Sequence, residues 1–560
     1  MQDETRNTTY ITADLEPDPD TRGAQRFPRL TDEMAERVAV YGEAEQVPAG
    51  TVLFERGQRG ADFFFVLQGG IEIIDIDNDG RPRMVTTHTR HQFTGELDHF
   101  NQRMILVSGL TTVESRLIRI TRDNFRRLVS GEPDIGEIIM RAFILRRVNI
   151  IQKGIGGVVL IGSGHGADVL RLQRFLVRNG YPHRLIDTDI DPKAAGLLDT
   201  FDVQPHLFPV VVSPDHQMLM NPSTAELADS LGLTESIELG HVHDVAVVGA
   251  GPAGLAAAVY AASEGLDTIV IEGMAPGGQA GTSSKIENYL GFPTGISGQA
   301  LAGRAQIQAQ KFGARLAISR NVASLHCASQ PYDLELDDGQ RITARAVVIA
   351  TGARYRKLDV PNYERYEGQG IHYAATSMEG KLCAGEEVVV VGGGNSAGQA
   401  AVFLSRIAAH VHMLVRGAGL AATMSDYLIR RIHQSPRITL HTETQIVGLE
   451  GGDRLQHVTW SGRSDGSCET RAVANVFVMV GAEPNTDWLH GCLALDAKGF
   501  VITGIDGEGM PTSVPFATSK PGIFAVGDVR SGSVKRVASG VGEGSVVIQA
   551  VHTFLNPEAG

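Results

Sequence analysis

Hydrophobic and polar positions follow different patterns in successive parts of the chain. From about residue 47 to 120, short apolar segments alternate with glycine turns, which predicts a small β-roll. A helical stretch is expected to begin at Asp123, directly after the roll. The expected strands are residues 51–54, 63–67, 71–74, 84–87 and 116–120.

From about Gly156 to Leu233, apolar runs typical of strands alternate with helical patterns, which predicts a βαβαβα unit. A fold of this kind places its helices against a central sheet. The expected strands are residues 158–161, 184–187 and 210–212, and the expected helices are 169–176, a short helix up to Phe201 and one from Ala225.

A β-branched run beginning at Asp244 ends in three glycines at the spacing that a dinucleotide pyrophosphate requires. Gly249 permits the tight turn, Gly251 lets the backbone approach the phosphates, and Gly254 lets the helix pack on the strand. Glu272 ends the next apolar strand, about 20 residues beyond the last glycine, where a carboxylate can accept hydrogen bonds from a ribose diol. The sequence therefore predicts a first dinucleotide site here.

The same unit recurs downstream, after the apolar run 388–391. Gly392, Gly394 and Ala397 repeat the spacing of the first fingerprint, so a second dinucleotide site is expected. The strand that should carry the ribose-binding acid ends instead in Arg416. A guanidinium at this place suits a 2′-phosphate, and the alternative is a solvated arginine at a strand end.

Composition and charge narrow the functional classes. The chain has 560 residues, of which 42% are apolar and 20% charged, which predicts roughly three to five globular domains. Its net charge of −14 argues against non-specific nucleic-acid binding, which needs a basic surface. No apolar run reaches the roughly 18 residues of a membrane span, and a signal-peptide pattern is absent from the start. We therefore expect a soluble cytoplasmic protein with no membrane or nucleic-acid partner.

The cysteines and the first residues carry little further information. Cys327, Cys383, Cys468 and Cys492 lie far apart and show no metal-ligand spacing, so we expect neither a disulfide framework nor a metal site. Residues 1–28 are polar and proline-containing, which predicts a flexible tail.

From Val242 onward the chain resembles the low-molecular-weight thioredoxin reductase family of FAD- and NADPH-dependent flavoproteins. After the first fingerprint come motifs that match this family in order, among them Gly277-Gly-Gln279, Ala350-Thr-Gly352 and Gly522–Asp528. The resemblance implies FAD contacts from Gly249, Gly251, Pro252, Ala253, Gly254, Glu272, Gly278, Gln279, Asn288, Val322, Thr351, Gly352, Gly527, Asp528, Arg536, Val537 and Ala538. It implies NADPH contacts from Gly392, Gly394, Asn395, Ser396, Ala397 and Arg416.

The resemblance also implies an architecture. The FAD domain is expected to be discontinuous, at 242–360 and 486–560, with an NAD(P)H domain at 361–485 inserted into it. Each would be a Rossmann-type parallel sheet with helices, so the expected fold class is multi-domain α/β. The family dimerises through its FAD domains, so a homodimer is expected.

The sequence departs from this family at the redox motif. Where the family has Cys-Ala-Thr-Cys, this chain reads Ala374-Ala-Thr-Ser377, and neither Ala374 nor Ser377 can form a disulfide. Cys383 lies nearby, but a lone thiol without a resolving partner is interpreted as a buried apolar residue. One of the three family arginines for the 2′-phosphate is present, as Arg416. NADPH is preferred because no acid stands there to favour NADH, which remains the alternative.

The two amino-terminal regions show their own resemblances. Residues 29–150 look like a cyclic-nucleotide-binding domain, in which Gly95-Glu96-Leu97 matches the start of the phosphate-binding cassette. The run 104–108 is apolar where the family has its phosphate-binding residues, and only Arg103 could substitute. The favoured interpretation is a sensory or dimerising fold that has lost the ligand, and the alternative is a degenerate cyclic-nucleotide site formed by Gly95, Glu96, Leu97 and Arg103.

Residues 156–235 resemble a thioredoxin or glutaredoxin fold, and Pro209 matches the proline that is cis in that family. Gly164–Asp168 stands where the family has its CxxC, so thiol exchange is excluded and an adapter or docking role is expected.

Two functions follow from these features. The first is an FAD-dependent NAD(P)H oxidoreductase whose flavin passes electrons to a small-molecule or protein acceptor that the sequence does not identify. The second is a redox- or ligand-responsive regulatory flavoprotein with little turnover. The presence of both nucleotide fingerprints favours the enzyme.

Overall fold

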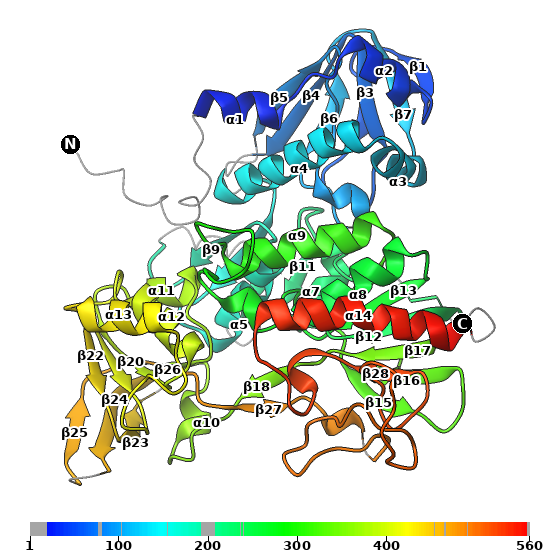
Figure 1. The fold of residues 1–560 in the computed structure, drawn as a ribbon. Coiled ribbons are helices and arrows are strands. Elements are labelled where there is room, and N and C mark those ends of the chain that lie inside the picture. Colours follow the sequence, from blue (N-terminus) through cyan, green and yellow to red (C-terminus); the bar gives the residue numbers. More distant parts are fainter. Residues whose placement is uncertain are drawn as a thin grey trace, which may run out of the picture.

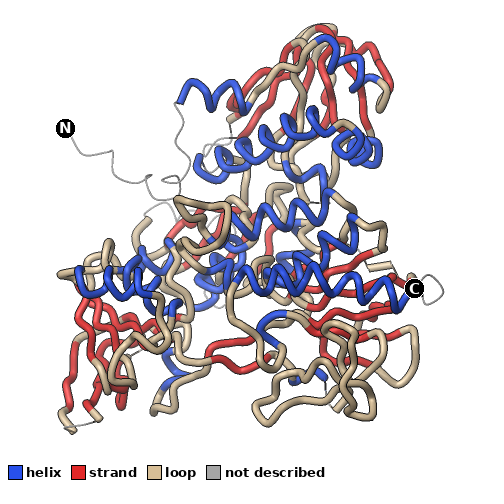
Figure 2. The backbone as a smooth tube through the Cα atoms, in the orientation of Figure 1, coloured by secondary structure: helices blue, strands red, loops and turns tan. Residues whose placement is uncertain are grey.

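The computed structural model describes residues 19–76, 81–101, 103–153, 155–191, 208–235, 237–238, 240–452, 454–463, 466–489 and 491–556. A β-roll with its helices lies at one end of the molecule, and the two large sheets lie at the other (Figure 1). Helices lie beside the strands of the β-roll and along the two large sheets, as Figure 2 shows.

The β-roll consists of two antiparallel sheets, with the strand orders β1-β7-β3 and β2-β6-β4-β5. Its strands are β1 (Glu43–Val47), β2 (Val52–Phe54), β3 (Phe63–Gln68), β4 (Gly70–Ile76), β5 (Pro82–Thr89), β6 (Ser108–Thr111) and β7 (Ser115–Ile120). Strands β1 and β6 were not predicted, because their mostly polar or small residues do not form the apolar run on which the prediction of strands depended. The helices are α1 (Pro19–Arg26), α2 (Asp32–Ala39), η1 (Leu97–Phe100), α3 (Arg122–Gly131) and α4 (Pro133–Lys153).

Helix α1 corrects part of the prediction of a flexible tail at 1–28. Pro19–Arg26 is helical, and Arg26 Nη1 donates to Asn149 Oδ1 in α4 at 3.1 Å. Residues 1–18 lie outside the described part of the chain.

A four-stranded sheet follows, with the order β11-β10-β8-β9. Its elements are β8 (Val158–Gly162), α5 (Ala167–Arg178), β9 (His183–Asp187), β10 (Val210–Val212), β11 (Met218–Met220) and α7 (Thr224–Leu231). Strand β11 was not predicted and forms a hairpin with β10. The predicted short helix up to Phe201 falls outside the described residues. The Phe208–Pro209 peptide bond is cis, as the resemblance implied.

The sheet around the first fingerprint has the order β14-β13-β12-β17-β16-β15, with β28 paired to β17. Strand β12 is parallel to both of its neighbours, β13 and β17. The elements are β12 (Val242–Val248), α8 (Pro252–Ser263), β13 (Thr268–Glu272), η3 (Ala280–Thr282), α9 (Gly298–Lys311), β14 (Arg315–Ile318), β15 (Val322–His326), β16 (Tyr332–Leu336), β17 (Arg341–Ile349), β28 (Ile523–Ala525), η5 (Gly527–Val529) and α14 (Val537–Leu555).

The second large sheet is entirely parallel, with the order β19-β26-β20-β21-β22, and a three-stranded antiparallel sheet follows its last strand. The antiparallel pair β18 (Ala353–Tyr355) and β27 (Ala482–Pro484) lies where the chain passes between the two large sheets (Figure 1). The remaining elements are α10 (Tyr363–Tyr366), β19 (Ile371–His372), α11 (Ser377–Leu382), β20 (Glu387–Val391), α12 (Asn395–Leu404), β21 (His410–Leu414), α13 (Asp426–Gln434), β22 (Ile438–His441), β23 (Thr444–Gly451), β24 (Leu455–Gly462), β25 (Cys468–Arg471), β26 (Asn475–Val478) and η4 (Asp487–Leu489).

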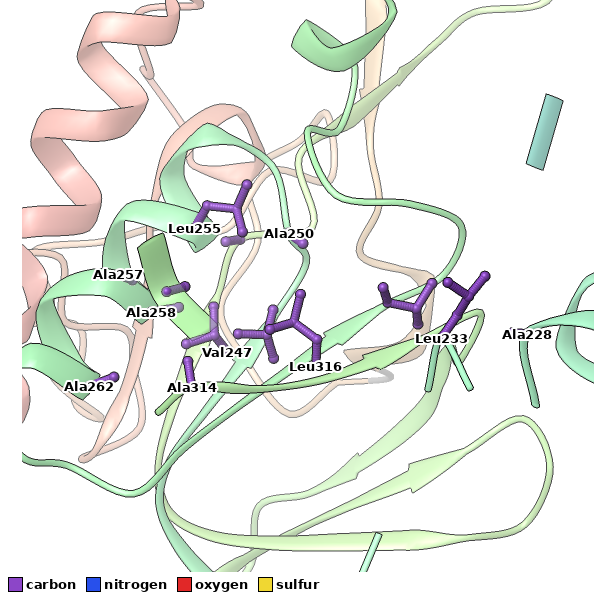
Figure 3. Packing of buried hydrophobic residues seen from close by; sticks show 14 of the residues in the cluster. Ala228, Leu233, Val247, Ala250, Leu255, Ala257, Ala258, Ala262, Ala314 and Leu316 are labelled. Atoms are coloured by element: carbon purple, nitrogen blue, oxygen red, sulfur yellow. The ribbon is translucent and has the colours of Figure 1, made fainter. Parts of the chain in front are cut away.

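The thioredoxin-like region and the first large sheet share one hydrophobic core. Leu233, directly after α7, belongs to the same buried cluster as Val247 of β12 and Leu316 of β14 (Figure 3). Phe175 and Leu176 of α5 are also members. Because burial of apolar surface is the main source of folding free energy, these two regions stabilise one another.

The structure overturns one expectation about the cysteines. Cys327 and Cys492 form a disulfide, although they lie 165 residues apart in the sequence. Cys327 follows β15 and Cys492 follows η4, and these two elements pack together. Only the tertiary fold brings the two thiols within bonding distance.

Within the described residues, every helix is too short or too polar to cross a bilayer.

Candidate functional site

Both glycine turns open into one cavity of about 1710 Å³. Typical small-molecule pockets enclose roughly 300–1,000 Å³, so this cavity has room for more than one ligand. Most residues that the sequence predicted for the two nucleotide sites line it. They are Gly249, Gly251, Pro252, Ala253, Glu272, Gly278, Gln279, Asn288, Thr351, Gly352, Gly392, Gly394, Asn395, Ser396, Arg416, Gly527, Asp528, Arg536, Val537 and Ala538.

The first turn has the geometry that its glycines require. Gly249 has φ +103°, and a Cβ there would collide with the carbonyl of Ala350. A Cβ at Gly254 would collide with the carbonyl of Gly249, so this glycine serves helix–strand packing and does not line the cavity. A Cβ at Gly251 would meet no atom within 4 Å, which leaves the backbone open to the cavity at the start of α8. Backbone N–H groups at such a helix start favour an anion.

Glu272 is held at the end of β13 by backbone donors. Its Oε2 accepts from the N–H of Ala250 at 2.8 Å, and its Oε1 accepts from the N–H of Met274 at 3.0 Å. The carboxylate is therefore fixed beside the glycine turn, where it lines the cavity. Val322, which the resemblance placed against adenine, is buried in β15 and does not line the cavity.

The first site also contains Asp528, in η5, which lines the cavity. Burial raises the pKa of the Asp528 carboxyl, and the charge of Lys535 counteracts part of this shift. Gln279 is fixed there because its side-chain amide donates to the carbonyl of Ala353. Thr351, which follows β17, donates from Oγ1 to the carbonyl of Asn485 at 2.8 Å. This hydrogen bond connects the end of β17 to the segment that follows β27.

The second turn repeats this arrangement in the other sheet. Gly392 has φ +141°, and a Cβ there would collide with the carbonyl of Met479. Asn395 begins α12 and its Oδ1 accepts from the N–H of Ser425 at 2.7 Å, which orders the loop before α13. Ala397 is buried in α12 and does not line the cavity. Arg416 is exposed at the cavity rim after β21.

The segment that the resemblance aligns with the redox motif lies between the two turns. Ala374 lines the cavity, whereas Ser377 is exposed at the start of α11 and does not. Cys383 is fully buried, and burial raises the pKa of its thiol to about 12. A thiol of this kind is almost entirely protonated at neutral pH, so it is a poor nucleophile.

Sequence reasoning missed one wall of the cavity, which comes from the thioredoxin-like region. Arg174, Val177 and Arg178 of α5 all line it. Their i, i+3, i+4 spacing places them on one helix face. That spacing was visible in the sequence, but it gives no indication of which surface the helix meets.

Helix α5 contacts both large sheets. Arg174 Nε lies 3.3 Å from Glu379 Oε1 in α11, and its Nη2 lies 3.1 Å from Nδ1 of His372 in β19. Arg178 Nη2 donates to the carbonyl of Gly278 at 3.0 Å. The helix therefore bridges the two nucleotide-binding halves at the cavity.

The degenerate cassette of the β-roll is occupied by the chain itself. Arg147 of α4 contacts Glu96 at 2.6 Å and also Asp98. Burial raises the pKa of Glu96 well above its ordinary value, which the charge of Arg147 opposes. Gly95 accepts a hydrogen bond from Arg146 Nη1 through its carbonyl at 2.7 Å, and Leu97 begins η1.

The cassette arginine and the apolar run face the thioredoxin-like region. Arg103 is buried and its Nη1 donates to the carbonyl of Asn179, directly after α5, at 3.2 Å. The N–H of Met104 donates to the carbonyl of Leu231 at 3.1 Å, and Leu106 belongs to the shared core. These contacts explain why the run is apolar, since it forms a domain interface.

A cluster of His241, His243 and Asp267 lies at the start of β12 and β13, with one ligand-type atom from each within 4.8 Å of the others. Arg315 also enters this cluster, with Nη2 at 3.3 Å from His243 Nδ1 and 3.6 Å from Asp267 Oδ1. The described contacts are those of an ion-pair network that joins the segment before β12 to β13 and β14.

Comparison with known families matches two models to this chain. A model described as "Pyridine nucleotide-disulphide oxidoreductase" matches residues 243–544, which is more than half of the chain. A model described as "Cyclic nucleotide-binding domain" matches residues 44–132.

Curated relatives match more than half of the chain. A thioredoxin reductase of Escherichia coli O157:H7 is 33% identical over 321 residues, which is 55% of this chain and 95% of that protein. NADPH-dependent thioredoxin reductase 3 of Arabidopsis thaliana is 32% identical over 358 residues, which is 60% of this chain and 65% of that protein. This chain thus spans about two thirds of the plant protein.

Solved structures of thioredoxin reductases also match more than half of this chain. The thioredoxin reductase of Lactococcus lactis in its FR conformation matches with a TM-score of 0.52 and 28% identity, over 56% of this chain and 99% of that one. The thioredoxin reductase of T. acidophilum matches with a TM-score of 0.51 and 29% identity, over 56% and 98%.

Proposed function

The chain belongs to the pyridine nucleotide-disulphide oxidoreductase family, and from this premise we propose that it transfers hydride from NADPH to a bound FAD and passes the electrons on without a protein disulfide. One observation carries the proposal: both glycine turns open into the same cavity. Two separate nucleotide sites would suit a scaffold, whereas a shared cavity allows two cofactors to react with each other.

The residues of the first site fit FAD. Gly251 leaves open space at the start of α8, where backbone N–H groups would meet the pyrophosphate. Glu272 is fixed where it would accept hydrogen bonds from a ribose diol, and Asp528 would accept hydrogen bonds from the ribityl chain. When bound, FAD supplies a two-electron acceptor for hydride.

The second site fits NADPH better than NADH. Arg416 is an exposed cation that lines the cavity after β21, and its guanidinium would donate hydrogen bonds to a 2′-phosphate. Gly394 stands open at the start of α12, where the pyrophosphate would lie.

Electrons then leave without a thiol step. Ala374 stands at the cavity wall where the resemblance places a cysteine, and Cys383 is buried with a raised pKa. We therefore propose that the acceptor, a small oxidant or a partner protein, takes two electrons directly from the reduced flavin. We also propose that the protein is cytoplasmic and that it forms a homodimer, the latter because the family resemblance implies it.

The test is anaerobic reduction of the FAD-loaded protein by NADPH, followed by separate additions of oxygen, a quinone and thioredoxin disulfide. The flavin absorbance should bleach with NADPH and return with oxygen or the quinone. Thioredoxin disulfide should leave it bleached. A matched variant, Ala374→Cys with Ser377→Cys, restores the sequence of the family motif. It tests whether the missing thiols are the reason why thioredoxin disulfide is not reduced.

Two results would contradict the proposal. Rapid thioredoxin reduction by the unmodified protein that disappears in Cys383→Ser would show that a displaced thiol carries the electrons. A flavin that NADPH does not bleach would instead favour the regulatory flavoprotein with little turnover.

A further inference from the structure

The FAD cavity has a wall that its own family fold does not provide. Arg174, Val177 and Arg178, which line it, belong to α5 of the thioredoxin-like region. We propose that Arg178 is an FAD-binding residue that pairs with the pyrophosphate, so that the thioredoxin-like region completes the cofactor site. This inference rests on the proposal that FAD occupies the first site.

The position of Arg178 points to the pyrophosphate. Its Nη2 donates to the carbonyl of Gly278 at 3.0 Å. Gly278 in turn lies against the glycine turn, since a Cβ added there would lie 3.1 Å from Cα of Gly251. Gly251 is the residue that opens the backbone to the phosphates at the start of α8. The guanidinium is therefore a near neighbour of the anion site.

The charge of Arg178 lacks a direct partner. Among the described residues, no carboxylate lies within ion-pair distance of its guanidinium, and its other contact is the Sδ atom of Met274, at 3.0 Å from Nη1. Burial lowers the pKa of Arg178, and the carboxylates of Glu272 and Glu379 counteract this from a distance. Because arginine stays charged in proteins, a nearby phosphate would neutralise the positive charge of Arg178.

Neighbouring contacts fix the helix end that carries Arg178. Asn179 Nδ2 donates to the carbonyl of Met274 at 3.1 Å, and the carbonyl of Asn179 accepts from Arg103 at 3.2 Å. Gln299 of α9 donates to the carbonyl of Val177. The β-roll and the FAD sheet thus both hold α5 in place, so Arg178 is pre-organised for binding.

The test measures binding rather than turnover. Apoprotein is titrated with FAD by flavin fluorescence, and ADP is used as a competitor because it carries a pyrophosphate without flavin. Arg178→Met keeps most of the apolar stem and removes the charge, and it should raise the Kd of FAD and the competition constant of ADP by about 10- to 100-fold. Arg178→Lys should recover part of this loss, and the salt dependence of FAD binding should be weaker in Arg178→Met.

Gln299→Ala is the matched control, because it removes a contact that docks α5 without lining the cavity. Its Kd for FAD should stay within about twofold of the unmodified protein. Equal losses in Gln299→Ala and Arg178→Met would show that docking, and not the charge, matters, which would overturn the inference. Unchanged FAD binding in Arg178→Met would overturn it as well. If the unmodified protein binds no FAD at all, the proposed function itself fails.

Discussion

Replacement of Arg416 by alanine should reduce the use of NADPH much more than the use of NADH. Arg416 follows β21 at the rim of the cavity, in the position where a dinucleotide fold reads the 2′ group of the ribose. A hydrogen bond to a charged group contributes about 1.5–3 kcal/mol, but exposed pairs lie at the lower end because water and salt screen them. A loss of about 1–2 kcal/mol corresponds to about a 5- to 30-fold fall in kcat/KM for NADPH.

The assay is steady-state oxidation of each nucleotide with an artificial acceptor, at low and high salt. Arg406→Ala is the control, since Arg406 is also exposed but does not line the cavity. Arg416→Glu should lower NADPH use further and raise NADH use, because a carboxylate repels the phosphate and accepts from the free 2′-hydroxyl. An equal loss for both nucleotides in Arg416→Ala would refute the assignment of Arg416 to the 2′-phosphate.

Three other predictions concern the thiols, the buried charges and the assembly. With a pKa near 12, only about one Cys383 thiol in 10⁴ is ionised at pH 8. Iodoacetamide should therefore alkylate the exposed Cys468 and leave Cys383 unmodified until the protein unfolds, which peptide mass spectrometry would detect. Arg147→Met should lower the free energy of unfolding by about 3–5 kcal/mol in urea titrations, because it leaves the acidic side chains of Asp98 and Glu96 buried without the cation that contacts both. A change below about 1 kcal/mol would contradict this. Light scattering at micromolar concentration should give a dimer, and a monomer would contradict the proposed homodimer.

Features that depend on local backbone geometry could be predicted from the sequence. The strand, the glycine spacing and the helix at Gly249 and again at Gly392 are adjacent in the chain, and the positive φ of each first glycine agrees with the tight turn that the spacing predicts. The cis bond before Pro209 and the absence of cysteine from residues 374–377 are equally local. Strands β1 and β6 were missed, because short strands with polar or small residues show little hydrophobic periodicity.

Features that depend on contacts between distant segments required the tertiary structure. The sequence expectation failed for Cys327 and Cys492, which pair because β15 packs against η4. Arg103 was considered only as a phosphate ligand, whereas it binds the carbonyl of Asn179 in the neighbouring region.

The wall of the cavity formed by α5 shows the same limit. The pattern of α5 predicts an amphipathic helix, and its residues carry no signal of what they contact. Arg174 and Arg178 reach the cavity because Phe175 and Leu176, on the apolar side of the helix, are buried in a core shared with the first large sheet. Periodicity determines that a helix has a face to bury, but the partner of that face is selected by packing among all the elements of the fold.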